Sequence, residues 1–306
     1  MKYFVTGASG WIGSAVVAQM LAGGHEVVGL ARSDASAARI EASGATPLRG
    51  NLDDPAGLAE AAAGSDGVIH LAFNHEVAFE QGDLAAAALA DRRAVEAMGT
   101  ALAGSGRPLV IASGVAGLAA GRPATEHDGL MPPEGIRGTP LAGRHATSLL
   151  ALSLAGIGVR ASVVRFAPTV HGEGDEGFIS TFVDVARRRG VSGHVGSGAN
   201  RWSAVHVSDA ARLVLLAAES AFPGAVAHAT SEDGVAFRDI AEAIGSQLGV
   251  PSAAVEAGQA LEHFGFLGMF AGQDLSASSA MTRQLFGWEP NGPTLIEDIE
   301  AGRYTR

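Results

Sequence analysis

The chain of 306 residues has no cysteine, one lysine and two tyrosines. Without cysteine it forms neither disulfides nor thiolate zinc or iron–sulfur sites, and it offers no thiol nucleophile. The ten histidines show no H-E-x-x-H or comparable spacing, so we expect no metal site. The single lysine, Lys2, begins the first apolar run, so any mechanism that needs a lysine in a catalytic pocket must use Lys2 or do without one.

Basic charge and long apolar runs are also scarce. With 21 Lys+Arg against 32 Asp+Glu, the formal charge is −11, which is the wrong sign for general binding to nucleic acid. Residues 145–159 form the longest stretch around the middle of the chain without Asp, Glu, Lys or Arg, and they fall short of the roughly 20 residues of a membrane-spanning helix. The first residues show no basic and apolar leader pattern. We therefore expect a cytoplasmic protein without nucleic-acid or membrane partners.

The hydrophobic content of 47% supplies ample core for one large or two smaller domains. Short apolar runs alternate with helical patterns, and this rhythm implies right-handed crossovers and a parallel sheet covered on both faces. The predicted fold is α/β, a Rossmann-type doubly wound parallel sheet. Strands are predicted at residues 3–6, 27–31, 46–49, 68–71, 109–113 and 161–166, and helices at 11–21, 35–43, 55–63, 84–102 and 146–155.

The sequence predicts a dinucleotide-binding core over residues 1–165 and a smaller, mixed α/β part over residues 166–306 that caps the substrate site. Segments of the second part can return to the core, which would make one continuous domain. In this part we expect helices at residues 178–189, 210–220, 237–248 and 260–270 and a strand at 226–230. Residues 114–143 are rich in glycine and proline without a sustained period, so they are predicted to form a long loop over one edge of the site.

The first predicted strand runs into T-G-A-S-G-W-I-G, residues 6–13, and then into a helix. In this context Gly7 permits the tight turn, Gly10 lets the backbone approach a pyrophosphate, and Gly13 allows close packing of helix and strand. The phosphates would lie on the helix N-terminus. A glycine-rich turn without a ligand is the alternative, but the strand, turn and helix in sequence favour dinucleotide binding.

This T-G-x-x-G-x-x-G pattern resembles that of the extended short-chain dehydrogenases/reductases, and further segments carry the resemblance over most of the chain. Residues 50–52 (GNL) resemble the family's G-D-L adenine contact, 69–72 (IHLA) its fourth-strand end, 165–172 (RFAPTVHG) its R-x-x-x-V-Y-G segment, and 205–209 (VHVSD) its H-V-x-D segment. The resemblance implies a nicotinamide cofactor. The residues implied to hold it are Thr6, Gly7, Ser9, Gly10, Trp11, Ile12, Gly13, Asn51, Leu52, Leu71, Ala72 and Phe73.

The residues after the second predicted strand bear on the choice between NAD and NADP. An acidic residue there would accept the adenosine ribose hydroxyls of NAD, whereas an arginine favours the 2′-phosphate of NADP. The sequence has Ala31 in the place of that acid, followed by Arg32 and Ser33, which offer a charged fork and a hydroxyl. The alternative is an ordinary surface arginine beside Asp34. The pattern favours NADP over NAD.

Carbonyl reductases of the family use a tyrosine, a lysine four residues later, and a serine. Tyr3 and Tyr304 are the only tyrosines, so the Y-x-x-x-K pair is absent, which resembles atypical members of the superfamily. The helix that would carry the pair starts near residues 141–146 and offers Arg144, His145 and Thr147 instead. Ser113, at the end of the fifth predicted strand, matches the family's serine; the alternative is a serine that only caps the strand end.

We predict that Ser113 orients a substrate oxygen and that Arg144 stabilises a developing oxyanion or grips a carboxylate. The candidate proton donors near neutral pH are His145, His171 or a water molecule. Each of these residues has an ordinary alternative role: a solvated helix residue for Arg144, and a buried, hydrogen-bonded ring for the two histidines. His206 is expected to anchor the start of a helix, and Trp202 suits either the core or the substrate site.

The leading interpretation is an NADP-dependent oxidoreductase that transfers hydride to or from a small carbonyl or alcohol substrate, as a monomer or a homodimer. Two alternatives stay open. An NADP-binding sensor or regulator without turnover is compatible with the missing tyrosine and lysine. A sugar-nucleotide epimerase or dehydratase is less favoured, because the family's members with that activity also rely on the missing pair.

Overall fold

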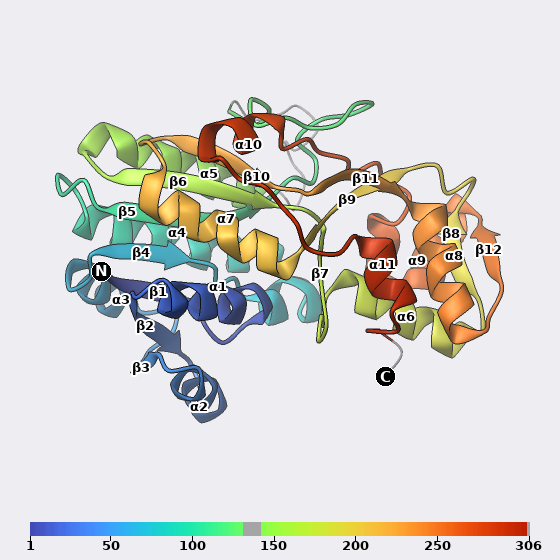
Figure 1. The fold of residues 1–306 in the computed structure, drawn as a ribbon, viewed down its shortest axis with the longest axis horizontal. Helices are drawn as coiled ribbons and strands as arrows, with labels where there is room; N and C mark the ends of the chain where they lie inside the picture. Colours follow the sequence, from blue (N-terminus) through green and yellow to red (C-terminus); the bar gives the residue numbers. More distant parts are fainter. Residues whose placement is uncertain (131–141, 305–306) are drawn as a thin grey trace.

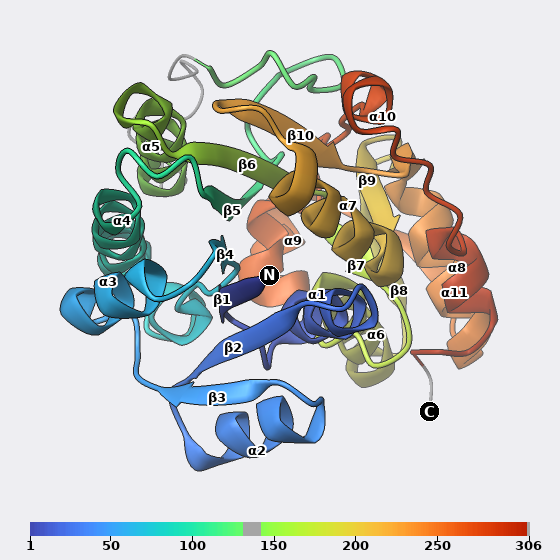
Figure 2. The same cartoon turned by 60° about the vertical axis from the view of Figure 1, so that its left-hand side comes forward.

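The structure, a computed structural model, describes residues 1–130 and 142–304. Its main element is a seven-stranded parallel sheet in the order β10-β6-β5-β4-β1-β2-β3. Figure 2 shows this order running from the top to the bottom of the molecule. The predicted α/β fold class is confirmed. The strands are β1 (Lys2–Thr6), β2 (Glu26–Ala31), β3 (Thr46–Arg49), β4 (Gly67–His70), β5 (Pro108–Gly114), β6 (Arg160–Phe166) and β10 (Ala225–Ala229).

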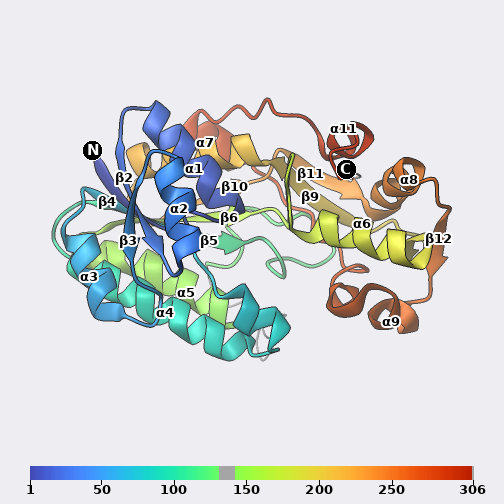
Figure 3. The ribbon, with the colours of Figure 1, turned by 90° about the horizontal axis from the view of Figure 1, so that it is seen from below.

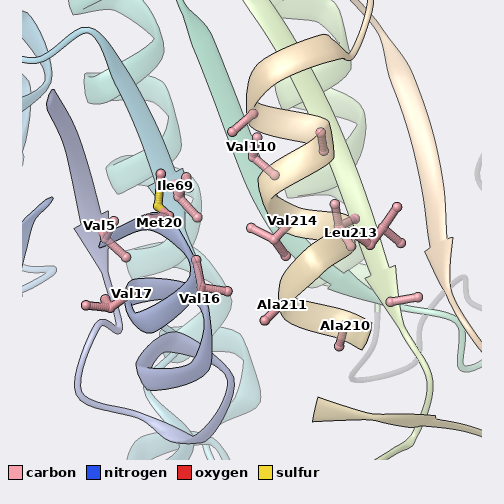
Figure 4. Packing of buried hydrophobic residues seen from close by; sticks show 14 of the residues in the cluster. Val5, Val16, Val17, Met20, Ile69, Val110, Ala210, Ala211, Leu213 and Val214 are labelled. Atoms are coloured by element: carbon pink, nitrogen blue, oxygen red, sulfur yellow. The ribbon is translucent and has the colours of Figure 1, made fainter. Parts of the chain in front are cut away.

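Helices cover both faces of this sheet (Figure 3). On one face lie α1 (Trp11–Ala22), α2 (Asp34–Ala42) and α7 (Val207–Ser220); on the other lie α3 (Pro55–Ala63), α4 (Leu84–Ala101) and α5 (Ala142–Ser153). Successive side chains of a strand point to opposite faces, so Val5 joins the core cluster under α1 and α7, whereas Phe4 joins the one under α3 and α4. Figure 4 shows the first cluster, to which α1 contributes Val16 and α7 contributes Val214.

Shorter elements form a second part at the other end of the molecule (Figure 1). A three-stranded sheet contains β7 (Thr169–His171), β9 (Arg201–His206) and β11 (Glu232–Ala236), and β8 (Ser192–Val195) pairs with β12 (Ser252–Val255). Around them lie α6 (Phe178–Arg189), α8 (Phe237–Leu248), α9 (Ala260–Phe264) and α11 (Leu295–Glu300). The chain nevertheless returns to the main sheet after β6, because α7 covers one of its faces and β10 is its edge strand. Helix α10 (Ala280–Phe286) packs against both α7 and β10.

Three predicted helices differ from the structure by more than two residues. Helix α5 begins at Ala142 instead of residue 146, and α7 begins at Val207 instead of residue 210. The helix predicted over 260–270 is interrupted, because α9 ends at Phe264 where Gly265 takes φ +62, and a 3-10 turn, Gly265–Met269, follows. Of the loop predicted over 114–143, residues 131–141 lie outside the described residues and 142–143 belong to α5.

Candidate active site

The candidate site lies at the carboxyl ends of β1 and β4. Here the direction of the crossovers changes, because β2 and β3 lie on one side of β1 while β5 and β6 lie beyond β4. Ligands of open α/β sheets bind outside this point. The glycine loop, residues 6–13, follows β1 and touches the segment after β4, since a Cβ placed on Gly7 would come within 2.8 Å of the Ala72 backbone nitrogen.

The three glycines of this loop differ in their conformation and in the space around them. Gly7 has φ +72, a conformation that favours glycine, and Gly13 is tightly enclosed, since a Cβ there would lie 1.9 Å from the Gly7 carbonyl oxygen. Gly10 is exposed, and a Cβ there would meet, among the described residues, only the Gly7 carbonyl oxygen at 3.3 Å. Internal packing therefore explains Gly7 and Gly13 but not Gly10, which leaves space in front of the helix.

The start of α1 fits an anionic group such as a diphosphate. All of α1 is described. Its N-cap residue is Gly10, so no N-cap side chain bonds to the first N–H groups, and the first turn holds no acidic residue. The first N–H groups of a helix lack partners within the helix and attract anions. Beside them, the Trp11 indole Nε1 donates to the Val170 carbonyl oxygen at 2.9 Å, which fixes the ring against the segment after β6.

Arg32 lies just after β2, with an exposed side chain whose Nη1 is 3.7 Å from a carboxylate oxygen of Glu76. The neighbouring Asp34 pairs with Arg49. The acid two positions after Arg32 therefore has its own partner, and the cation of Arg32 faces the segment after β4. The Ser33 hydroxyl accepts from the Ser36 backbone N at 3.2 Å and caps α2, a structural role that the sequence interpretation did not include.

The remaining predicted cofactor contacts lie along the same edge of the sheet. After β3, the Asn51 side-chain oxygen accepts from the Asp53 backbone N at 2.8 Å, and Leu52 packs against the cluster under α3 and α4. After β4, the Ala72 backbone N donates to the Thr6 hydroxyl at 3.3 Å. Half-buried residues of the glycine loop, of the first turn of α1 and of the segment after β4 complete the predicted set: Ser9, Ile12, Leu71 and Phe73.

A buried chain of polar contacts connects the glycine loop with α5. The Thr6 hydroxyl is 2.7 Å from His70 Nδ1, His70 Nε2 is 3.0 Å from Asp91 Oδ1, and Arg144 Nη1 is 3.1 Å from Asp91 Oδ2. An ionised carboxylate only accepts, so His70 donates from Nε2 to Asp91. One ordered set of hydrogen bonds thus runs from β1 to Arg144.

Asp91 is ionised in this arrangement. Its burial alone would raise the pKa, but the hydrogen bond from His70 and the charge of Arg144 outweigh burial and hold the pKa of Asp91 below its usual value. A charged carboxylate that is nearly inaccessible is stable only when it is paired in this way. Asp91 therefore fixes the position of the Arg144 guanidinium.

Arg144 and Ser113 meet at the end of β5. Arg144 Nη2 donates to the Ala112 carbonyl oxygen at 3.2 Å, and its guanidinium lies over the Phe73 ring, 4.2 Å from the centroid. The Ser148 hydroxyl, one turn further along α5, is 2.8 Å from the Ser113 hydroxyl. When Ser148 donates, the Ser113 proton is left to bind a substrate oxygen. The structure thus brings together Thr6, Phe73, Ser113 and Arg144.

His145 lies in a different neighbourhood. It is buried, and a Cβ on Gly129 would be 2.9 Å from its Cε1 and 3.2 Å from Arg165 Nη2, so the histidine and the arginine flank the same glycine. Burial lowers the pKa of Arg165 to about 10, which still leaves it cationic at neutral pH. His145 follows Arg144 directly on helix α5, and its ring lies beside Gly129 and Arg165.

His171 is not brought to Ser113. Its ring is fully buried in β7, with Nδ1 2.6 Å from Asp298 Oδ2 on α11 and an edge-on contact to His206 at 5.5 Å between ring centroids. The prediction for His206 is confirmed, since its ring accepts from the Ser208 backbone N at 3.3 Å and caps α7. Trp202 is fully buried in the core of the C-terminal part.

The sequence interpretation missed Asp91, although a signal exists. In the alanine-rich helix α4 the buried residues include Ala87, Ala88, Ala94 and Val95, and Asp91 lies three or four positions from each of them. An acid on the buried stripe of an amphipathic helix needs a partner inside the protein. His70 was noted only as part of the I-H-L-A segment, and the contact between the two residues depends on the tertiary structure.

Within residues 1–130 and 142–304, no cluster of three or more His, Asp or Glu side chains suits a metal ion. No helix of this part of the chain combines the length and apolar character that crossing a bilayer requires.

Comparison with known proteins identifies a family to which the sequence is similar. The sequence profile described as "NAD dependent epimerase/dehydratase family" matches residues 3–229. An uncharacterised protein of Schizosaccharomyces pombe is 42% identical over 99% of this chain and 100% of its own length. A 4-hydroxy-2-methyl-3-oxo-4-farnesyl-3,4-dihydroquinoline-1-oxide ketoreductase of Stigmatella aurantiaca is 31% identical over 87% of this chain and 80% of its own.

Among solved structures, a dTDP-glucose 4,6-dehydratase of Streptomyces venezuelae with NAD bound is similar to this chain with a TM-score of 0.78. The two are 21% identical, and the similarity covers 99% of this chain and 96% of the dehydratase chain. At this identity the likeness establishes the fold.

Proposed function

Because the chain belongs to the NAD-dependent epimerase/dehydratase family and is thus an NAD(P)-dependent enzyme, we propose that it is an NADP-dependent oxidoreductase that reduces a carbonyl group. The observation that carries the proposal is the buried chain of contacts from Thr6 to Arg144, because it links the phosphate-binding loop to a cation beside Ser113. The 31% identical ketoreductase supports reduction of a ketone as the reaction.

The residues of the glycine loop fit a dinucleotide. Gly10 leaves space at the start of α1, whose N–H groups would bind the diphosphate. Arg32, beyond β2, would bind the 2′-phosphate of NADP in place of Glu76, its present partner. Leu52 and Leu71 would contact the adenine end, and Phe73 the nicotinamide end.

Reduction requires a hydride, which the reduced nicotinamide supplies to the carbonyl carbon, and a proton for the oxygen. Ser113 would donate a hydrogen bond to that oxygen, with Ser148 fixing the hydroxyl. Arg144, held by Asp91 and Ala112, would stabilise the negative charge that develops on the oxygen. Neither role needs the tyrosine and lysine that the chain lacks.

For the proton we favour His145 over His171. The His145 ring is buried beside Arg165, but it lies on the same helix as Arg144 and Ser148, whereas the His171 ring is enclosed beside Asp298 in the C-terminal part. His75, after β4, is a poorer acid, since burial and then the charge of Arg144 lower its pKa below the usual value. If His145 is the donor, His145→Ala should lower kcat by about 10²–10⁴-fold and remove a titration between pH 5 and 8, with cofactor affinity nearly unchanged.

The test has two steps. NADPH and NADH are first titrated into the protein and followed by intrinsic tryptophan fluorescence; then NADPH consumption is measured with ketones, aldehydes and UDP-glucose. We expect tighter binding of NADPH than NADH and oxidation of NADPH with at least one ketone or aldehyde. The variant Ser113→Ala should lower kcat with little change in NADPH affinity.

Three outcomes would contradict the proposal. Tight NADPH binding without turnover of any carbonyl would favour the sensor interpretation. Conversion of UDP-glucose without net NADPH consumption would favour an epimerase or dehydratase. Binding of neither cofactor would contradict the role assigned to the glycine loop.

A further inference from the structure

Aromatic side chains gather on the surface of the C-terminal part, at the start of α6 and after α9. Phe178, the first residue of α6, stacks on Phe270 with 6.4 Å between ring centroids and an 18° angle, and contacts Phe266 edge-on at 6.3 Å. Beneath them, Phe178 also contacts the buried Trp202 at 5.9 Å. The Phe266 side chain remains 38% exposed and that of Met269 50% exposed. We call Phe178, Phe266, Met269 and Phe270 the aromatic patch.

Two sets of contacts connect the neighbourhood of the patch with the glycine loop and with the segment after β5. On one side, residues 170–174 lie against Trp11, whose indole donates to Val170 and whose ring would be 3.7 Å from a Cβ on Gly174. Phe178 follows four residues later. On the other side, Ala116, three residues after Ser113, packs against the core cluster that also contacts Phe178 and Phe270. Figure 3 shows α6 and α9 at the same end of the molecule, with the other helices of the C-terminal part.

The charges of the C-terminal part argue against a nucleotide-sugar substrate. Residues 166–306 contain nine arginines against 17 aspartates and glutamates. Binding a diphosphate away from water requires cations or other strong donors directed at it. Four of the arginines pair with carboxylates and three donate to backbone carbonyls: Arg187, Arg201, Arg238 and Arg303 in the first group, and Arg189, Arg212 and Arg283 in the second.

We infer that the site takes an apolar, aromatic carbonyl compound whose ring system lies on the aromatic patch, with its carbonyl oxygen directed to Ser113 and Arg144. This inference rests on the proposed function and specifies its substrate class. Exposed apolar side chains gathered at a binding site are typical of a pocket for an apolar ligand, and aromatic rings add stacking contacts. The 31% identical relative is a ketoreductase whose name gives a quinoline oxide bearing a farnesyl chain, which agrees with this chemistry.

The test measures binding apart from turnover. The protein is saturated with NADP⁺, which cannot donate hydride, and 2-acetylnaphthalene, pyruvate and UDP-glucose are titrated by calorimetry. We expect 2-acetylnaphthalene to bind at least tenfold more tightly than the two polar probes. Phe266→Ser should weaken its binding at least tenfold, and Phe178→Leu should weaken it as well.

Phe222→Ser is the matched control. Phe222 is 53% exposed and lies between α7 and β10, outside the aromatic patch, so this variant should bind all three probes as the unaltered protein does. Equal or tighter binding of UDP-glucose, or unchanged binding of 2-acetylnaphthalene by Phe266→Ser, would overturn the inference. Failure of the proposed function is distinguishable, because it would show as absent NADPH binding or as absent oxidation of NADPH with every carbonyl, pyruvate included.

Discussion

The Asp91 carboxylate sets the arrangement of the candidate site, because it bonds to His70 on one side and to Arg144 on the other. We predict that Asp91→Asn lowers the free energy of unfolding by about 1.5–3 kcal/mol, since it removes a charge-assisted bond and leaves the Arg144 cation poorly compensated. If Arg144 stabilises charge on the substrate, kcat should fall more than KM rises. Urea denaturation and steady-state kinetics measure the two effects.

Glu96→Gln is the control for this prediction, because Glu96 is exposed on the same helix. A double-mutant cycle of Asp91→Asn with Arg144→Met isolates the contribution of the pair. Additive losses of stability in that cycle would mean that the ion pair does not couple the two residues.

Arg32 and Glu76 should act on cofactor choice in opposite directions. If Arg32 binds the 2′-phosphate as proposed, Arg32→Ala removes a charge-assisted contact, so NADPH affinity should fall more than tenfold, which corresponds to about 1.5–3 kcal/mol, with NADH affinity unchanged. Glu76→Gln frees the arginine from an exposed ion pair, and NADPH affinity should rise a few-fold at most, in keeping with the small energies of such pairs. Fluorescence titration at constant ionic strength measures both.

Arg39→Ala, an exposed arginine of α2, controls for the general loss of positive charge. If Arg39→Ala weakens NADPH binding as much as Arg32→Ala does, the 2′-phosphate is not recognised by Arg32.

At the scale of elements, substitutions in the glycine loop and α1 test separately what folding and what cofactor binding require. Gly13→Ala forces a Cβ toward the Gly7 carbonyl oxygen and must displace the start of α1, so we expect both a lower unfolding midpoint and lost cofactor binding. Gly10→Val meets only a 3.3 Å contact among the described residues, at a φ of −83 that any residue adopts, and should fold but bind neither NADPH nor NADH. Circular dichroism and cofactor titration distinguish the two outcomes.

Gly23→Ala, at the other end of α1, has φ −76 and ordinary contacts of 3.4 Å, so it should change neither property. Retained cofactor binding by a folded Gly10→Val protein would be incompatible with the placement of the diphosphate.

The sequence predicts some elements well and others not at all, because only some of them carry a local hydrophobic pattern. The central strands of the main sheet are short apolar runs because both faces are covered, whereas the edge strand β3 (T-P-L-R) is largely exposed. These runs and the glycine motif between a strand and a helix predict the fold class and the phosphate loop. Strands β7, β8, β9, β11 and β12 have three to six residues and include sequences such as S-G-H-V, which carry no apolar run or alternation. Nothing local in the sequence signals them.

In the candidate site, too, the sequence predicts some features and not others. Ser113, Arg144 and the glycine loop follow from motifs and from the family resemblance, whereas the Asp91 bridge and the separation of His171 from Ser113 depend on how distant segments pack. His171 lies at a V-H-G segment that resembles the family's V-Y-G, yet its nearest charged partner is Asp298, 127 positions further along the chain.

At the scale of the whole molecule, residues 298–304 pack against β7 and the segment that follows it. Asp298 on α11 forms a hydrogen bond with His171 at 2.6 Å and an ion pair with Arg303 Nε at 3.0 Å, and the Tyr304 hydroxyl donates to Asp175 at 3.0 Å. The same segment contacts Trp11 at the glycine loop. The C-terminal residues therefore stabilise a segment that touches the proposed cofactor site.

This packing predicts an acid-dependent loss of stability. Burial would raise the pKa of Asp298, but the hydrogen bond and charge of His171, together with the charges of His206 and Arg303, hold it below the usual 3.8. A carboxylate with a depressed pKa in the folded state contributes stability that is complete above its unfolded pKa and is lost as the pH falls through the folded value. The contribution of Asp298 should therefore be present at pH 5 and above and decline below about pH 4.

We predict that Asp298→Asn lowers the free energy of unfolding at pH 7 by roughly 3–5 kcal/mol, because it leaves His171 and Arg303 without their buried acceptor charge. The difference from the unaltered protein should shrink as the pH falls below 4, since both proteins then lack the charge. NADPH affinity should fall as well, because the segment against Trp11 loses its support. Urea denaturation from pH 3 to 7 measures the first two effects, with the exposed Glu300→Gln on the same helix as the control. A stability difference that stays constant over this pH range would show that Asp298 acts through its shape and hydrogen bonds alone, and not through its charge.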